Sequence, residues 1–353
     1  MDEPRDPATL ALHADRGHDE LPDVAPALRP STTFERMDGG WTYRRGDADP
    51  AGRLETVLGA LEGGFAVAYP SGMAAVAAVL RWLGPVRIAL PEEVYHGTRA
   101  FVEAEADRGV WELAGPEDLE AGDVWFVETP SNPKCLVTDI ASVAAEANER
   151  DVVTIVDSTF ATPVLQRPLG LGADVVVHST TKFVGGHSDA LGGILVTGDE
   201  EAAGMLRSAR VRDGAIPGAL ETWLTLRGVR TLAVRVGRQS ETALRIATTL
   251  DGDRRVERVW YPGLVDHPGH DVAARQMTAF GGVLSFELDS PAEAARVVRA
   301  LRLFRRATSL GGVESLVEHR IDADSGAPPG LVRLSVGLEG SDDLLDDLDA
   351  ALG

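Results

Sequence analysis

Residues 152–157 read VVTIVD, and residues 173–186 read ADVVVHSTTKFVGG. Each stretch contains a run of β-branched apolar residues that is typical of a strand buried in the middle of a sheet. The first run ends at Asp157, and the second is followed shortly by Lys182. Because ligands of parallel sheets bind beyond the carboxyl ends of the strands, we expect Asp157 and Lys182 to meet over one ligand.

A lysine and an aspartate placed in this way match the needs of pyridoxal 5'-phosphate (PLP). The lysine amine forms a Schiff base with this cofactor, and a carboxylate keeps the pyridine nitrogen protonated, so that the ring accepts electrons. Lys182 is one of only two lysines in the chain, the other being Lys134. Taken singly, a surface lysine and a helix-capping aspartate are the simpler alternatives; taken together, the two residues favour PLP.

Short apolar runs alternate with helical patterns along the first two thirds of the chain. Leu54, Leu58 and Leu61, for example, share one face of a predicted helix that ends at Gly63. This alternation predicts an α/β fold with a mainly parallel central sheet. We expect strands at 65–69, 86–90, 124–127, 152–156, 173–177 and 194–197, and helices at 74–83 and 140–150.

The last third of the chain has a different pattern. A long helical stretch at 221–250 precedes strand patterns at 283–288 and 331–336 and helical patterns at 292–301 and 342–352, which predicts a smaller α+β domain with an antiparallel sheet. The first 45 residues carry turn signals and little periodicity, so we expect an extended arm. We divide the chain into an N-terminal arm at 1–45, a PLP-binding domain at 46–230 and a C-terminal domain at 231–353.

The charge of the chain is strongly negative. Asp and Glu total 55 against 34 Lys and Arg, which gives −21 and argues against nucleic acid as a partner. With so little lysine, this balance fits a halophile, in which high salt screens the self-repulsion of the protein. An acidic protein from a GC-rich genome, which also favours arginine, is the alternative.

Other global features point to a cytoplasmic enzyme. The chain has no run of about 18 apolar residues, so we expect no membrane span. Residues 1–19 lack the apolar core of a signal peptide. Cys135 is the single cysteine, which excludes a disulfide within the chain and suits a reducing compartment. His267 and His270 have no third ligand candidate, and we predict no metal site.

A phosphate site is also predicted. Residues 70–73 read PSGM and join a predicted strand to an alanine-rich helix. Backbone N–H groups at such a helix N-terminus bind anions, and Gly72 permits close approach. Ser179 and Thr181 offer hydroxyl groups beside the lysine. Ordinary capping of the helix by Ser71 is the alternative.

Eight segments occur in an order that resembles one known family. They are YRR at 43–45, PSGMAA at 70–75, YHGT at 95–98, ETPSNP at 128–133, DSTFATP at 157–163, residues 178–193, SLGGVESL at 309–316 and residues 331–339. Over nearly its whole length the chain is similar to the PLP-dependent transsulfuration family of cysteine and methionine metabolism, which includes cystathionine γ-synthases and γ-lyases. The resemblance implies the aspartate aminotransferase-like PLP fold, fold type I.

The resemblance also implies a role for each matching position. Lys182 would carry the cofactor and move protons, Asp157 would pair with the pyridine nitrogen, and Tyr95 would stack on the ring and help to deprotonate the incoming amine. The implied phosphate ligands are Gly72, Met73, Ser179 and Thr181, joined by Tyr43 and Arg45 from a neighbouring subunit. A shared site of this kind implies a homo-oligomer, and we expect a tetramer.

Arg333 is implied to bind the α-carboxylate of an amino-acid substrate, assisted by Asn132 and Ser309. Residues 332, 334 and 336 are apolar, so we expect the Arg333 guanidinium to point away from the apolar face of its strand. A planar fork suits a carboxylate, and a surface arginine on an edge strand is the alternative. Glu314 is implied to face the distal amino group of cystathionine.

The implied activity is γ-replacement or γ-elimination on an O-acylhomoserine or on cystathionine. The segment at 95–98 lacks the cysteine of methionine γ-lyases. An O-acylhomoserine sulfhydrylase and a cystathionine β-lyase stay open as alternatives, and a non-catalytic PLP-fold scaffold is a remote one. The sequence departs from the family at three places: DADP at 47–50 in place of Asn-Pro-Thr, Ser158 in place of Asn, and a short segment between Glu318 and Leu331 without a Met-Thr-His run. The last segment lies near the substrate entrance in the family and therefore bears on substrate choice.

Overall fold

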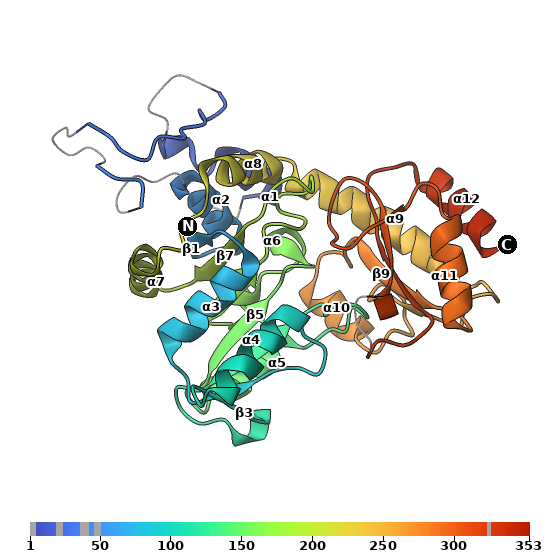
Figure 1. The fold of residues 1–353 in the computed structure, drawn as a ribbon, viewed down its shortest axis with the longest axis horizontal. Coiled ribbons are helices and arrows are strands. Elements are labelled where there is room, and N and C mark those ends of the chain that lie inside the picture. Colours follow the sequence, from blue (N-terminus) through green and yellow to red (C-terminus); the bar gives the residue numbers. More distant parts are fainter. Residues whose placement is uncertain (1–4, 19–23, 36–41, 46–50, 323–325) are drawn as a thin grey trace.

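A computed structural model describes residues 5–18, 24–35, 42–45, 51–322 and 326–353. The described residues form two sheets with helices around them, joined by the long helix α9 (Leu232–Asp251) (Figure 1). The predicted boundary after residue 45 and the divergent stretch at 47–50 lie outside the described residues or at their limit. Among the described residues, no helix is long and apolar enough to cross a membrane.

The larger sheet has seven strands. Four of its strand pairs are parallel, namely β6 with β5, β5 with β4, β4 with β2, and β2 with β3. Strand β7 runs antiparallel to both of its neighbours, β6 and β1. This confirms the mainly parallel central sheet. In spatial order the strands are β1 (Phe65–Tyr69), β7 (Gly193–Thr197), β6 (Val175–His178), β5 (Val153–Asp157), β4 (Val124–Glu128), β2 (Arg87–Ala89) and β3 (Glu112–Leu113).

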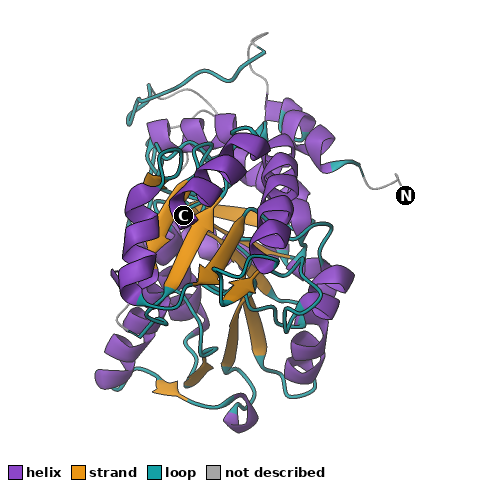
Figure 2. Ribbon diagram, turned by 90° about the vertical axis from the view of Figure 1, so that its right-hand side faces the viewer, coloured by secondary structure: helices purple, strands orange, loops and turns teal. Residues whose placement is uncertain are grey.

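Helices cover both faces of this sheet (Figure 2). Successive side chains of a strand point to opposite faces, so Val175 and Val177 pack in one core while Val176 packs in the other. On the first face lie α3 (Gly72–Leu83), α4 (His96–Asp107) and α7 (Glu200–Asp213). On the second face lie α2 (Gly52–Glu62), α5 (Ile140–Asn148), α6 (Thr162–Leu165) and α8 (Ala219–Val229).

The smaller sheet is formed by the C-terminal part of the chain. All its pairings except β10 with β11 are antiparallel, as expected for an α+β domain. Its strands, in spatial order, are β10 (Arg305–Arg306), β11 (Leu316–His319), β12 (Leu331–Ser335), β9 (Val283–Glu287) and β8 (Arg258–Trp260). Helices α9, α11 (Pro291–Ala300) and α12 (Ser341–Leu352) share its core, and α10 (His270–Gln276) lies in the connection from β8 to β9. The described residues also form four short 3-10 helices: η1 (Arg16–His18), η2 (Pro116–Asp118), η3 (Pro168–Leu171) and η4 (Arg320–Asp322).

Two expectations about this fold are wrong. The helical stretch predicted at 221–250 is two helices, because the helix is interrupted at residues 230–231, between α8 and α9. The N-terminal segment is not extended throughout, since Pro7–His13 forms helix α1. Asp6 caps this helix by accepting a hydrogen bond from the Ala8 N–H at 2.8 Å, and α1 packs on α2 and α9. Four apolar side chains within a seven-residue helix, three of them consecutive, gave no helical periodicity to detect.

Candidate active site

A cavity of about 340 Å³ lies at the carboxyl ends of β4, β5 and β6, beside the smaller sheet. Residues from both parts of the chain line it. The cavity brings together ten of the thirteen residues that the sequence singled out: Gly72, Met73, Tyr95, Asn132, Asp157, Ser179, Thr181, Lys182, Ser309 and Arg333.

Lys182 follows β6 in a tight loop that is held from behind. Gly186 has a φ of +71°, and a Cβ there would lie 1.9 Å from Nη1 of Arg235. That guanidinium is buried and donates to the Phe183 carbonyl at 2.7 Å, which braces the loop. Burial and the positive charge of Arg333 lower the pKa of the Lys182 ammonium. The neutral amine, which is the nucleophilic and basic form, is therefore favoured.

Asp157 ends β5 and faces the same cavity. Its Oδ1 atom accepts hydrogen bonds from the Thr159 backbone N–H at 3.0 Å and from the Thr159 hydroxyl at 2.5 Å. Burial raises the pKa of this carboxyl, and the two hydrogen bonds oppose the rise. A cation bound next to Asp157 would favour the charged carboxylate. A protonated pyridine nitrogen is a cation of this kind.

The predicted phosphate site has the geometry of an anion cradle. Gly72 and Met73 are the first two residues of α3, whose N–H groups have no partner inside the helix. Ser71 does cap this helix, since its Oγ accepts from the Ala74 N–H at 3.1 Å. A Cβ at Gly72 would lie 3.0 Å from the Cβ of Ser179, so glycine keeps this wall open. The donors and the available space fit a phosphate group.

Tyr95 is held by a residue that the sequence analysis did not single out. Glu128, the last residue of β4, is buried, and its Oε2 accepts the Tyr95 N–H at 2.6 Å. Its Oε1 accepts the Asn132 N–H at 3.2 Å. Burial and the nearby Asp157 carboxyl raise the pKa of Glu128 well above its usual range. Glu128 directly follows a predicted strand, as Asp157 does, and this position is the sequence signal that could have identified it as a site residue.

Arg333 excludes one alternative, that of a surface arginine on an edge strand. It lies on β12, a central strand and not an edge strand, and it is 4% exposed. Its guanidinium does leave the apolar face, but it enters the cavity between the two sheets. Nη1 donates to Asn132 Oδ1 at 2.7 Å, and Nη2 donates to the Ser309 carbonyl at 2.9 Å. Burial is the main reason that the pKa of Arg333 falls to about 10.

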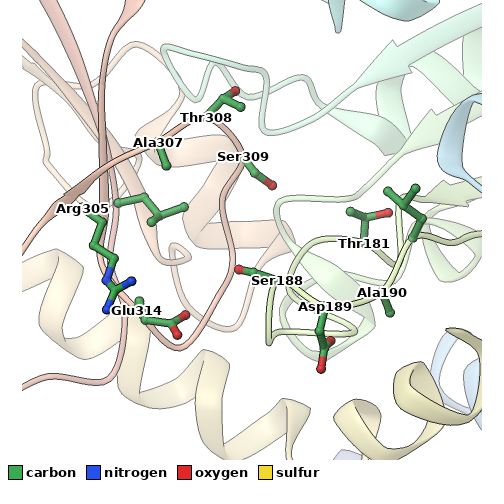
Figure 3. A pocket seen from close by; sticks show the side chains of 11 residues that line it. Thr181, Ser188, Asp189, Ala190, Arg305, Ala307, Thr308, Ser309 and Glu314 are labelled. Carbon is green, nitrogen blue, oxygen red and sulfur yellow. The ribbon is translucent and has the colours of Figure 1, made fainter. Parts of the chain in front are cut away.

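Three sequence candidates lie away from this cavity. Tyr43 is 49% exposed, and Arg45 donates to the Val211 carbonyl at 3.2 Å, so neither lines the cavity of its own chain. Glu314 lines a second pocket of about 550 Å³ that shares Thr181 and Ser309 with the first. Figure 3 shows Arg305 and Glu314 on the segment from 305 to 314, facing the loop that carries Ser188 and Asp189.

Comparison with known proteins places the chain among relatives of similar length. The family model described as "Cys/Met metabolism PLP-dependent enzyme" matches residues 8–353. A cystathionine gamma-synthase of Mycobacterium tuberculosis is 41% identical over 98% of this chain and 97% of its own. A cystathionine beta-lyase of Lactococcus lactis subsp. cremoris is 40% identical over 93% of this chain and 94% of its own.

Solved structures agree with this comparison. A cystathionine gamma synthase from Xanthomonas oryzae pv. oryzae, in complex with aminoacrylate and cysteine, superposes with a TM-score of 0.94 at 37% identity. The match covers 99% of this chain and 98% of that one. The fold type inferred from the sequence segments is thereby confirmed.

Proposed function

Because the chain belongs to the family of Cys/Met metabolism PLP-dependent enzymes, we propose that it is a transsulfuration enzyme of the cystathionine γ-synthase/γ-lyase type. It carries out γ-replacement or γ-elimination on an O-acylhomoserine or on cystathionine. The observation that carries this proposal is the meeting of Lys182, Asp157 and Arg333 in one cavity. These are the groups that hold PLP, tune its ring and bind an amino-acid carboxylate.

The cofactor is proposed to lie with its phosphate at Gly72, Met73, Ser179 and Thr181 and its pyridine nitrogen at Asp157. When bound, PLP supplies an electron sink that stabilises negative charge on the substrate carbon. Tyr95 is proposed to lie against the ring and to take a proton from the substrate amine. The Glu128 carboxylate holds the backbone of Tyr95 in place for this task.

Lys182 is proposed to move the protons of the reaction. Departure of a γ-substituent requires removal of a proton at Cα and then at Cβ, and one amine within reach of both carbons serves for both steps. The lowered pKa of Lys182 favours the neutral base that these steps need. The Ser309 hydroxyl, which accepts a hydrogen bond from Nζ at 2.9 Å, keeps the amine directed into the cavity.

The second pocket is proposed to take the γ-substituent. It adjoins the cofactor cavity, since Thr181 and Ser309 line both. Its charged lining residues are Asp189, Arg305 and Glu314. Two carboxylates and one guanidinium suit a substituent that carries an ammonium and a carboxylate group, as the cysteine end of cystathionine does, with Glu314 near the ammonium group.

A cystathionine β-lyase is the second candidate. The relative from Lactococcus lactis, which bears that name, is almost as similar to this chain as the γ-synthase is. Both activities use the same cofactor and the same carboxylate site, and they differ in whether the bond to sulfur breaks at Cγ or at Cβ. An O-acylhomoserine sulfhydrylase would replace cysteine by sulfide.

Product analysis with the PLP-loaded protein tests the proposal. Purified protein is given cystathionine alone, O-acylhomoserine with cysteine, and O-acylhomoserine with sulfide. Formation of cystathionine, or of cysteine and 2-oxobutanoate from cystathionine, supports the γ-type enzyme. Homocysteine and pyruvate from cystathionine would establish a β-lyase instead. A protein that binds PLP and makes none of these products would leave the scaffold alternative.

We also propose that the enzyme is a cytoplasmic homotetramer of a halophile. The net charge of −21 and the near absence of lysine support the high-salt setting. The exposure of Tyr43 and its distance from its own cavity support a site that is shared between subunits. The one cysteine, Cys135, is buried and free, as expected in a reducing compartment.

A further inference from the structure

A buried cluster of three charged residues lies beside the proposed substrate site. Glu318 on β11 is the cross-strand neighbour of Arg333 on β12, and its Oε2 accepts a hydrogen bond from Arg333 Nη2 at 2.8 Å. The same oxygen accepts from Arg320 Nη1 at 2.5 Å. The side chains of Arg333, Arg320 and Glu318 are only 4%, 8% and 11% exposed.

The charges of this cluster do not balance. Two guanidinium groups share one carboxylate, which leaves an excess positive charge in a buried place. Burying a charge without a partner is costly, and a bound anion removes the cost. An anion with one negative charge would therefore be stabilised here.

Arg320 has donor capacity to spare. It lines the cofactor cavity, and its buried Nε–H has no hydrogen-bond partner among the residues that the structure describes. Arg333 has less, because both N–H groups of its Nη2 are engaged, one by the Ser309 carbonyl and one by Glu318. An incoming carboxylate thus finds an unused donor on Arg320.

We propose that Arg320 is a second carboxylate-binding residue, which together with Arg333 receives the α-carboxylate of the substrate. Glu318 holds the two guanidinium groups together and competes with that carboxylate for them. The inference rests on the proposed function, because it adds a residue to the substrate site of that enzyme. The position of Arg320 is fixed by the strand before it, since η4 begins at Arg320, directly after β11.

The proposal gives opposite expectations for the two partners. Arg320→Met replaces the aliphatic stem of the side chain and removes the charged guanidinium, so a carboxylate should bind about 10-fold or more weakly. Glu318→Gln removes the competing charge and leaves both guanidinium groups, so a carboxylate should bind several-fold more tightly. A purely structural cluster would lose binding in both variants. Arg302→Met, at an exposed arginine outside this cavity, is the matched control and should bind as the wild type does.

Binding of acetate to the PLP-loaded protein is the measurement. Acetate is titrated at constant ionic strength, and the visible absorbance of the cofactor reports its binding without turnover. PLP content and thermal unfolding are measured for each variant, so that a misfolded Arg320→Met protein is recognised. In that case Glu318→Gln still tests whether removing the competing carboxylate strengthens acetate binding. Equal acetate affinity in wild type and Arg320→Met, or weaker binding in Glu318→Gln, overturns the inference. If the wild type holds no PLP at all, the proposed function itself fails.

Discussion

The Lys182 amine donates a hydrogen bond to the Ser309 hydroxyl over 2.9 Å, and this bond joins the two parts of the chain. Lys182 follows β6 of the larger sheet, whereas Ser309 lies between two strands of the smaller sheet. Close packing keeps the segments in place, because a Cβ at Gly311 would lie 2.6 Å from the Phe183 backbone nitrogen. The orientation of the lysine amine thus depends on how the two sheets are assembled.

Replacement of this lysine should abolish the reaction. Lys182→Ala removes both the attachment point of the cofactor and the group that moves protons, so turnover should fall by about 10²–10⁴-fold or more. The protein should lose its covalently bound, yellow cofactor, which absorbance after dialysis detects. Lys134→Ala, at the only other lysine, is the control and should stay yellow and active. Wild-type activity in Lys182→Ala would refute the mechanism.

Replacement of Arg333, the proposed carboxylate-binding residue, should separate substrate binding from cofactor binding. In Arg333→Lys a point charge replaces a planar fork, which should cost on the order of 2–4 kcal/mol in kcat/KM. KM for amino-acid substrates should rise while PLP content stays near that of the wild type. Steady-state kinetics and cofactor absorbance measure the two effects. A parallel loss of PLP would assign Arg333 to the cofactor or to the fold.

Glu128 should prove to be a positioning residue. Glutamine at this position keeps one acceptor and turns an N–H donor toward the N–H of Tyr95 or of Asn132, so that one of the two contacts is lost. We expect Glu128→Gln to lower kcat/KM by about 10-fold or more, in line with leaving a buried N–H group without its acceptor. Circular dichroism of the bound cofactor should also change, because the Tyr95 ring is displaced.

Glu93→Gln is the matched control for this test. Glu93 binds Ser131 and Lys134 in the same pair of loops, but it contacts neither of the backbone N–H groups that Glu128 holds. Its variant should retain the cofactor spectrum. If the two variants behave alike, charge in these loops matters and not the specific contacts of Glu128.

The assembly should depend on salt. The charge of −21 per chain multiplies on association, and the screening length falls from about 10 Å at 0.1 M salt to about 3 Å at 1 M. We expect low salt to dissociate the tetramer and to release PLP, because Tyr43 and Arg45 would no longer reach a neighbour's phosphate site. Sedimentation and activity at both salt levels measure this. A fully active monomer would contradict the shared site.

The centre of the site could be predicted from sequence because it lies at strand ends. An apolar run followed by Asp157 or Lys182 needs only the geometry of a parallel sheet to bring the two residues together. The phosphate cradle was equally local, since a strand, Gly72 and an alanine-rich helix are contiguous. A few contiguous residues are therefore enough to predict where such features lie in the fold.

The surroundings of Arg333 could not be predicted in this way. Its partners Ser309 and Glu318 are 24 and 15 residues away and reach it through the pairing of the smaller sheet. Asn132 is 201 residues away, and its contact depends on how the smaller sheet docks against the larger one. The alternation of apolar and polar residues along the strand correctly predicted that the guanidinium points away from the apolar side. It did not show that the polar side is itself buried, because periodicity reports only one face of a strand at a time.

The position of β1 at the edge of the larger sheet has a consequence for synthesis on the ribosome. Phe65–Tyr69 leaves the exit tunnel long before its partner strand, Gly193–Thr197, has been made. During that interval its backbone groups lack a neighbouring strand, and the side chains of Val67 and Tyr69, which end up buried, contact water or chaperones. A chain that stalls or is truncated between these two strands should therefore be the form most prone to aggregate.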